Sequence, residues 1–171
     1  MRYRKILVAI DRSSQAEAVF EQALELAKTE EASLMLFHCL SSELQGSSLY
    51  ADVYGVRLVN YSHAMQEQLR KDREEARELL AKYCQISTAQ GVPTEWDVKV
   101  GSAEKAISEL ANTWDADLVV LGRRGHRGLT EIVLGSVSNY VVHHAPCSVL
   151  IVQGISPTVD KTPEVVTQAK S

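Results

Sequence analysis

The segment that decides the fold of this chain is Ala116–Gly128, with the sequence ADLVVLGRRGHRG, and a Gly-Ser pair follows at positions 135 and 136. Its first part, Ala116–Leu121, is the short apolar run typical of a buried parallel strand. Residues Ser136–His143 are predicted to form a helix, so a strand leads through a glycine-rich loop to a helix N-terminus. Such a terminus presents free backbone N–H groups and the positive end of the helix dipole, and both suit phosphate oxygens.

The glycines of this loop have a defined spacing, because two residues separate Gly122 from Gly125 and nine more precede Gly135 and Ser136. This spacing differs from the GxGxxG fingerprint of dinucleotide-binding folds and from the GxxxxGK[ST] P-loop. Glycine lets the backbone approach a ligand closely, which favours phosphate binding. The alternative is that these glycines serve only turns and the close packing of helices against the sheet.

The composition indicates one globular α/β domain, since 171 residues are enough for a single core but not for two ordinary domains. The net charge of −4 argues against a nucleic-acid-binding protein, which normally has a basic excess. No apolar run approaches the ~20 residues of a membrane span. The cysteines are odd in number and far apart, which predicts neither a disulfide framework nor a zinc site. Because Asp11 also cuts short the N-terminal apolar run, we expect a cytoplasmic protein without a signal peptide.

Hydrophobic patterns predict the remaining elements. Further strands are expected at Ile6–Ile10, Ser33–Leu40, Thr94–Val100 and Ser148–Gln153, of which Thr94–Val100 alternates as a half-exposed edge strand does. Further helices are expected from Ser14 to about Lys28, from about Ser62 to about Gly91, and at Ala103–Thr113. Ser14 and Glu17 are expected to form a capping box, and Ser102 to be an N-cap. Residues 41–61 are predicted to be a long loop, and residues 154–171 a mobile tail.

Five strands in alternation with four helices predict a doubly wound parallel sheet. The strand order 3-2-1-4-5 places the first strand beside the fourth, so that Asp11 and Gly122 lie at neighbouring strand ends, ~4.8 Å apart. The Asp11 carboxylate could then accept hydrogen bonds from ribose hydroxyls, or hold a divalent metal that also touches phosphates. The alternative is a turn residue that accepts hydrogen bonds from local N–H groups.

Four segments carry a resemblance to a known family, and they are Lys5–Ser13, Leu36–Cys39, Ala116–Gly122 and Gly135–Val152. Over residues 5–153 the chain resembles the universal stress protein family. Gly122, Gly125, Gly135 and Ser136 meet the family pattern G-2x-G-9x-G-[ST], which marks its ATP-binding members. The resemblance implies an adenine nucleotide alpha hydrolase-like fold, in one domain over residues 1–153.

The resemblance also implies the ligand and its contacts. The ligand is expected to be ATP or another adenine nucleotide, ADP or AMP, with Mg²⁺ or Mn²⁺ between its phosphates and Asp11. The residues expected to border adenine and ribose are Ala9, Ile10, Asp11 and a backbone group of Cys39. The residues expected to surround the phosphates are Gly122, Arg123, Gly125, Gly135, Ser136 and Val137.

The family forms homodimers through its last strand, which here contains Val149, Leu150, Ile151 and Val152. Pairing there would remove an exposed apolar edge. We find no paired carboxylates at acid–base spacing, no nucleophile elbow and no HExxH motif, so we expect no dedicated enzyme. The first hypothesis is therefore a nucleotide-sensing regulator of the stress response. The alternatives are a slow ATP-hydrolysing or nucleotide-transferring enzyme in which Asp11 holds the metal, and a nucleotide-independent interaction protein that uses the charged helix after Ser62.

Overall fold

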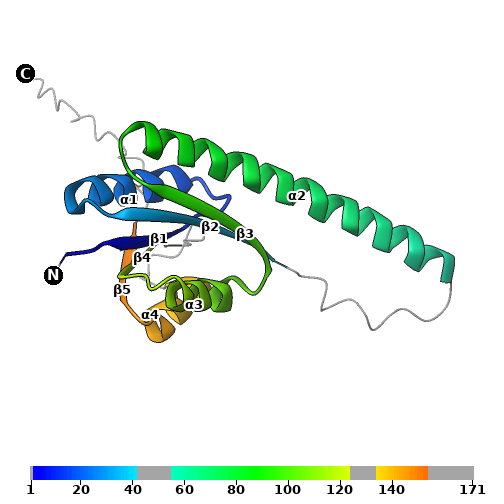
Figure 1. The fold of residues 1–171 in the computed structure, drawn as a ribbon. Helices are drawn as coiled ribbons and strands as arrows, with labels where there is room; N and C mark the ends of the chain where they lie inside the picture. The colour runs from blue at the N-terminus through cyan, green and yellow to red at the C-terminus, as the bar shows by residue number, and fades with distance from the viewer. Residues whose placement is uncertain (1, 42–54, 124–133, 154–171) are drawn as a thin grey trace, which may run out of the picture.

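The structure is a computed structural model that describes residues 2–41, 55–123 and 134–153, without the side chains of residues 55–62. The described residues form strands and helices in strict alternation (Figure 1). The strands are β1 (Lys5–Ala9), β2 (Ser33–Ser41), β3 (Thr94–Gly101), β4 (Leu118–Gly122) and β5 (Ser148–Val152). The helices are α1 (Ala16–Glu30), α2 (Gly55–Ala89), α3 (Ala103–Thr113) and α4 (Ser136–His144). The predicted tail at 154–171 lies outside the described residues.

The sheet is parallel throughout and has the strand order β3-β2-β1-β4-β5, which confirms the predicted doubly wound α/β fold. Strand β1 is central, and Ile6, Leu7 and Val8 within it have no exposed surface. Ala9 pairs with Phe37 of β2 on one side and with Leu121 of β4 on the other. The carboxyl ends of these three strands therefore meet at one edge, where the strand order reverses.

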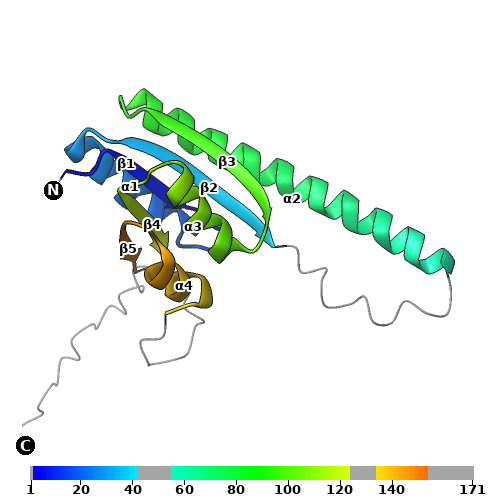
Figure 2. The ribbon, with the colours of Figure 1, turned by 60° about the horizontal axis from the view of Figure 1, so that its bottom comes forward.

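Helices cover both faces of the sheet, with α1 and α2 on one face and α3 and α4 on the other (Figure 1, Figure 2). Because successive side chains of a strand point to opposite faces, Ile6 and Val8 belong to the core beneath α1 and α2. Leu7 and Val119 belong to the second core, beneath α3 and α4. Burial on both faces explains why the inner strands are continuous apolar runs in the sequence.

Helix α2 begins at Gly55 rather than near Ser62, so the predicted loop over residues 41–61 is wrong at both ends. Ser41 is the last residue of β2, and residues 42–54 lie outside the described residues. No glycine or proline occurs between Val56 and Gln90. Helix growth is cooperative, and this stretch contains no helix-breaking residue, so the helix extends towards the N-terminus as far as Gly55. The N-terminal part of α2 extends past the sheet (Figure 1), and none of the described helices is apolar enough over sufficient length to cross a membrane.

The predicted capping box at the start of α1 does not form. The helix begins at Ala16, and its N-cap residue, Gln15, makes no side-chain capping hydrogen bond. Instead, Oδ1 of Asp11 accepts hydrogen bonds from the backbone N–H of Ser13, at 3.0 Å, and from its hydroxyl, at 2.5 Å. The Ser13 hydroxyl oxygen in turn accepts from the N–H of Gln15, at 3.2 Å. A short side chain that folds back on its own turn competes with the capping arrangement, and here it replaces it.

Candidate functional site

A cavity of about 400 Å³ lies at the edge of the sheet where the carboxyl ends of the inner strands meet. Its walls come from the ends of β1, β2 and β4 and from the first turns of α3 and α4. The predicted site residues that line it are Ala9, Ile10, Asp11, Cys39, Gly122, Ser136 and Val137. Arg123 and Gly135 are described but do not belong to this lining, and Gly125 lies outside the described residues. The volume falls within the range of small-molecule sites, roughly 300–1,000 Å³.

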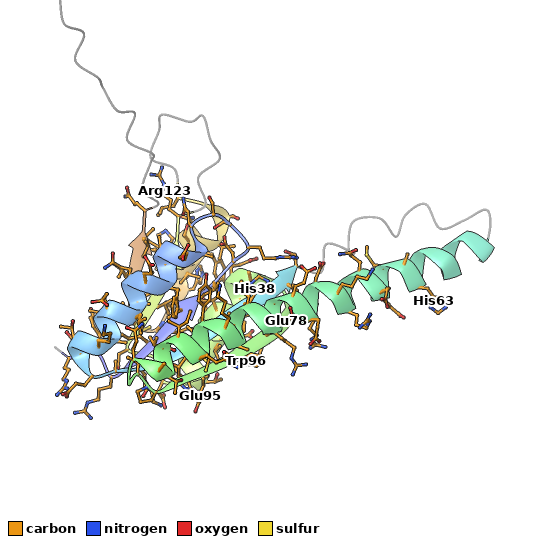
Figure 3. All side chains as sticks on the ribbon, turned by 90° about the horizontal axis from the view of Figure 1, so that it is seen from above. His38, His63, Glu78, Glu95, Trp96 and Arg123 are labelled. Atoms are coloured by element: carbon orange, nitrogen blue, oxygen red, sulfur yellow. The ribbon has the colours of Figure 1, made fainter. Side chains whose placement is uncertain are left out.

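The end of β1 is held in place by β2 through both polar groups of Ile10. The N–H of Ile10 donates to the carbonyl of Phe37 at 2.8 Å, and Nδ1 of His38 lies 2.6 Å from the Ile10 carbonyl oxygen. Since a carbonyl only accepts, Nδ1 of His38 carries the proton. His38 is buried in β2 (Figure 3). The sequence patterns did not identify His38 as a positioning residue, although its place one residue before Cys39 in a buried strand is a signal for a hydrogen-bonded core histidine.

Asp11 has two relations to the site. It lines the cavity, and its carboxylate also organises the turn through Ser13. The alternative role of a turn residue is therefore present in the structure. A carboxylate has two oxygens and about four lone-pair sites, so holding this turn leaves it able to accept further hydrogen bonds.

Close packing explains why position 122 is a glycine. A Cβ atom at Gly122 would lie 3.1 Å from Cγ2 of Val19 and 3.4 Å from Oε1 of Gln15. Both neighbours belong to the start of α1, on the face of the sheet opposite α3 and α4. The N–H of Arg123 then donates to the carbonyl of Val152 at 3.0 Å, which continues the ladder between β4 and β5. Figure 3 shows Arg123 well separated from α2. At this glycine the structure supports the packing alternative that the sequence left open.

The start of α4 forms the electropositive end of the cavity. Gly135 is its N-cap residue, without a side-chain capping hydrogen bond, and the first turn contains no acidic residue. Ser136 and Val137 line the cavity, and the Ser138 hydroxyl donates to the Gly135 carbonyl at 3.0 Å. The first backbone N–H groups of a helix have no acceptor within the helix, and they carry the positive end of its dipole. This arrangement is suited to an anion.

The start of α3 also lines the cavity, which the sequence analysis did not anticipate. Ser102, Ala103, Glu104 and Ile107 contribute to the wall. Ser102 occupies the N-cap position, as predicted, but makes no capping hydrogen bond to the helix backbone. A hydrogen bond from its side chain, together with one from the backbone N–H of Glu104, holds the pKa of the Glu104 carboxyl below its usual value. Glu104 is therefore ionised at neutral pH and supplies negative charge at this helix start.

Cys39 lies on the wall between the two helix starts. Burial raises the pKa of its thiol, and the charge of Glu104 raises it further, while Lys99 opposes the shift. Burial also raises the pKa of Cys147, with a smaller contribution from Asp117. Both thiols are half-buried and stay protonated at neutral pH.

Arg12 connects the rim of the cavity to α2. It lines the cavity, its Nη1 lies 3.2 Å from Oδ1 of Asp72, and it forms a second ion pair with Glu75. All three side chains are substantially exposed. Among the described residues there is no group of three or more His, Cys, Asp or Glu side chains that could hold a metal ion.

Comparisons with known proteins agree over nearly the whole chain. Residues 2–153 match the model of the universal stress protein family. A universal stress protein of Synechocystis sp. is 50% identical over 153 residues, which cover 90% of this chain and 99% of that protein. The structure of universal stress protein UspA from Lactobacillus plantarum has a TM-score of 0.71 at 25% identity, covering 89% of this chain and 99% of that one. The universal stress protein from Archaeoglobus fulgidus in complex with dAMP has a TM-score of 0.59 at 24% identity, covering 88% of this chain and 98% of that one.

Proposed function

Since this chain belongs to the universal stress protein family, as its motifs predict, we propose that it is a homodimeric, adenine-nucleotide-sensing regulator of the stress response. The observation that carries the proposal is the cavity at the strand-order reversal, which has an uncapped helix start on its wall. A related protein has been solved with dAMP, an adenine nucleotide. The ligand we propose is ATP, with ADP and AMP as the other candidates.

The lining residues suggest how the nucleotide would lie. The phosphates would rest against the backbone N–H groups at the start of α4, with the Ser136 hydroxyl as a further donor. Asp11, at the neighbouring strand end, would accept hydrogen bonds from the ribose. The adenine would then lie over Cys39, between β2 and α3. Asp11 is a single carboxylate, which fits Mg²⁺ or Mn²⁺ carried by the phosphates, because Mg²⁺ is usually bound by one or two carboxylates together with substrate phosphates.

A variant of the helix start gives the sharpest test of phosphate binding. Ser136→Asp adds a carboxylate to the first turn of α4, where it interacts favourably with the helix dipole but repels phosphate. We expect the protein to stay folded and to lose at least about tenfold in ATP affinity by calorimetry, equivalent to ~1.4 kcal/mol. Asn139→Asp is the matched control, because it makes the same change one turn later, outside the cavity lining. The absence of heat with ATP, ADP and AMP at millimolar concentration, with or without Mg²⁺, would contradict the proposal.

The dimer we propose pairs β5 of two chains. β5 is the last strand of the sheet, and Leu150 on it is 36% exposed. Pairing would satisfy its open edge. Light scattering after size exclusion should give twice the monomer mass for the natural protein and the monomer mass for Leu150→Lys. Val142→Lys is the control, since Val142 is 44% exposed but lies on α4. A natural protein that runs as a monomer would contradict this part of the proposal.

We further propose that bound ATP is sensed rather than consumed. Among the described residues that line the cavity, Asp11 and Glu104 are the only carboxylates, and Glu104 is engaged by Ser102 and by its own backbone N–H. Steady-state release of phosphate tests this, and several turnovers per minute that disappear in Asp11→Asn would favour an enzyme instead.

A further inference from the structure

The two helix starts that face the cavity have opposite electrostatic character. The first turn of α4 contains no acidic residue, whereas the first turn of α3 contains Glu104. Both starts belong to the lining of the same cavity. An anionic group is thus favoured at α4 and disfavoured at α3, because a carboxylate beside a helix N-terminus neutralises the dipole there. A ligand with phosphates at one end and a hydrogen-bond donor at the other matches this polarity.

The position of Glu104 places its carboxylate beside the proposed site of the base. Cys39, over which the base is proposed to lie, lines the same cavity as Glu104, and the pairing of Ser41 with Gly101 brings the start of α3 to the end of β2. Hydrogen bonding to the Ser102 side chain and to its own backbone N–H lowers the pKa of the Glu104 carboxyl, so the group is ionised and acts as an acceptor. A carboxylate has about four lone-pair sites, so Glu104 can also accept a hydrogen bond from a ligand donor. Exocyclic amines of nucleobases are such donors, whereas exocyclic carbonyls only accept.

We propose that Glu104 is a specificity-determining residue, whose carboxylate accepts a hydrogen bond from the 6-amino group of adenine and rejects purines with a 6-oxo group. The inference rests on the proposed nucleotide binding and adds the basis of its selectivity. A 6-oxo group would place a carbonyl oxygen against a carboxylate with no proton between them. Sites that hydrogen-bond a substrate group discriminate strongly against analogues without it, because their own polar groups are left unpaired. Glu104 is only half-buried, so we expect discrimination of about tenfold to a hundredfold rather than the larger ratios of dry sites.

The test compares ATP with ITP, in which a 6-oxo group replaces the 6-amino group and N1 carries a proton, by calorimetry on the full chain. The natural protein should bind ATP at least about tenfold more tightly than ITP. In Glu104→Gln the ratio should fall to within about threefold of unity, because an amide can donate to the 6-oxo group as well as accept from the 6-amino group. The amide oxygen still accepts from Ser102, so α3 should keep its start. Glu109→Gln is the matched control, because it makes the same change on an exposed residue of α3 outside the lining, and its ratio should equal that of the natural protein.

A third nucleotide separates attraction from repulsion. The triphosphate of unsubstituted purine riboside has neither group at position 6, so its affinity should lie between those of ATP and ITP in the natural protein. Equal affinities for ATP and ITP in the natural protein, or an ATP preference that survives in Glu104→Gln, would overturn the inference while nucleotide binding itself stands. Failure of every nucleotide to bind would overturn the proposed function and this inference together.

Discussion

The starts of α3 and α4 occupy equivalent places in the fold and differ in what they offer to a ligand. Each helix begins after the carboxyl end of a parallel strand, and each contributes its first turn to the same cavity. At α4 the first-turn amides have no acceptor within the helix and no acidic residue beside them, whereas at α3 the first turn contains an ionised Glu104. The topology therefore supplies two anion sites, and a single acidic residue converts one of them into an acceptor for a donor group.

The largest expected effect tests whether position 122, beside the start of α4, requires a glycine for ATP binding or for packing against α1. Gly122→Val should destabilise the protein by about 1–3 kcal/mol, because its side chain would enter the space held by Val19, which is 2% exposed. Gly122→Ala should cost less and keep ATP affinity within about threefold, equivalent to ~0.7 kcal/mol. Denaturation with urea measures the stability, and calorimetry measures the ATP affinity. In the double variant Gly122→Val/Val19→Ala, the loss of stability should be smaller than the sum of the losses in the two single variants. A stable Gly122→Ala protein that no longer binds ATP would instead assign this glycine to the ligand.

The next effect concerns the strand end between the two helix starts. His38→Ala should destabilise the protein by about 1–3 kcal/mol, because it leaves the Ile10 carbonyl without its buried donor. ATP and ITP should both bind more weakly and by the same factor, since the whole rim moves. His38→Asn is the control, because its amide can replace the Nδ1–H donor and should recover part of both losses. A change in the ratio of ATP to ITP would show that His38 contacts the base.

A smaller effect is expected in the alkylation rates of two cysteines, Cys39 and Cys147, which are both protonated at neutral pH but lie at different positions. The raised pKa values of Cys39 and Cys147 mean that, at any given pH below them, less thiolate is present than in an unburied cysteine, so alkylation should become rapid only at more alkaline pH. ATP should slow the alkylation of Cys39 severalfold, about one order of magnitude at most, and leave Cys147 unchanged, because only Cys39 lines the cavity.

The same labelling tests the position of Glu104. In Glu104→Gln the negative charge that raises the pKa of Cys39 is gone, so Cys39 should react faster at a fixed pH while Cys147 does not change. Peptide mass spectrometry follows both sites in one sample. An unchanged rate at Cys39 would place the carboxylate farther from the base site than the account requires.

The smallest effect lies outside both helix starts. Arg12→Ala removes exposed ion pairs to Asp72 and Glu75 and should cost at most about 1 kcal/mol, less in high salt. The preference for ATP over ITP should stay as it is. Arg70→Ala is the control, because it removes an exposed ion pair to Glu67 that lies within α2 and involves no residue of the cavity lining. A loss of base selectivity in Arg12→Ala alone would show that the rim, rather than α3, reads the base.

The sequence predicted the fold because the deciding patterns are local. Continuous apolar runs such as Ile6–Ile10 identify buried strands, and their alternation with helices leaves few topologies. Most predicted site residues lie on β1, β4 and α4 or directly beside them, where strand ends and glycines are visible in the sequence. Glu104 was missed because its place depends on register. Ser41 at the end of β2 pairs with Gly101 at the end of β3. This register places the end of β3, and therefore the start of α3, at the cavity. The capping box at Ser14 failed for a similar reason, since Asp11 had a competing local partner in Ser13.

In the proposed complex the phosphates lie at the start of α4 and the base lies at the start of α3. Backbone and side-chain NMR signals of the labelled protein, recorded with tripolyphosphate, with adenosine and with ATP, test it most directly. Tripolyphosphate should shift the amide signals of Ser136 and Val137 but no signal of the start of α3, adenosine should shift the Glu104 carboxyl signal, and ATP should shift both sets. Tripolyphosphate that perturbs the start of α3, or ATP that leaves Ser136 and Val137 unchanged, would contradict the account.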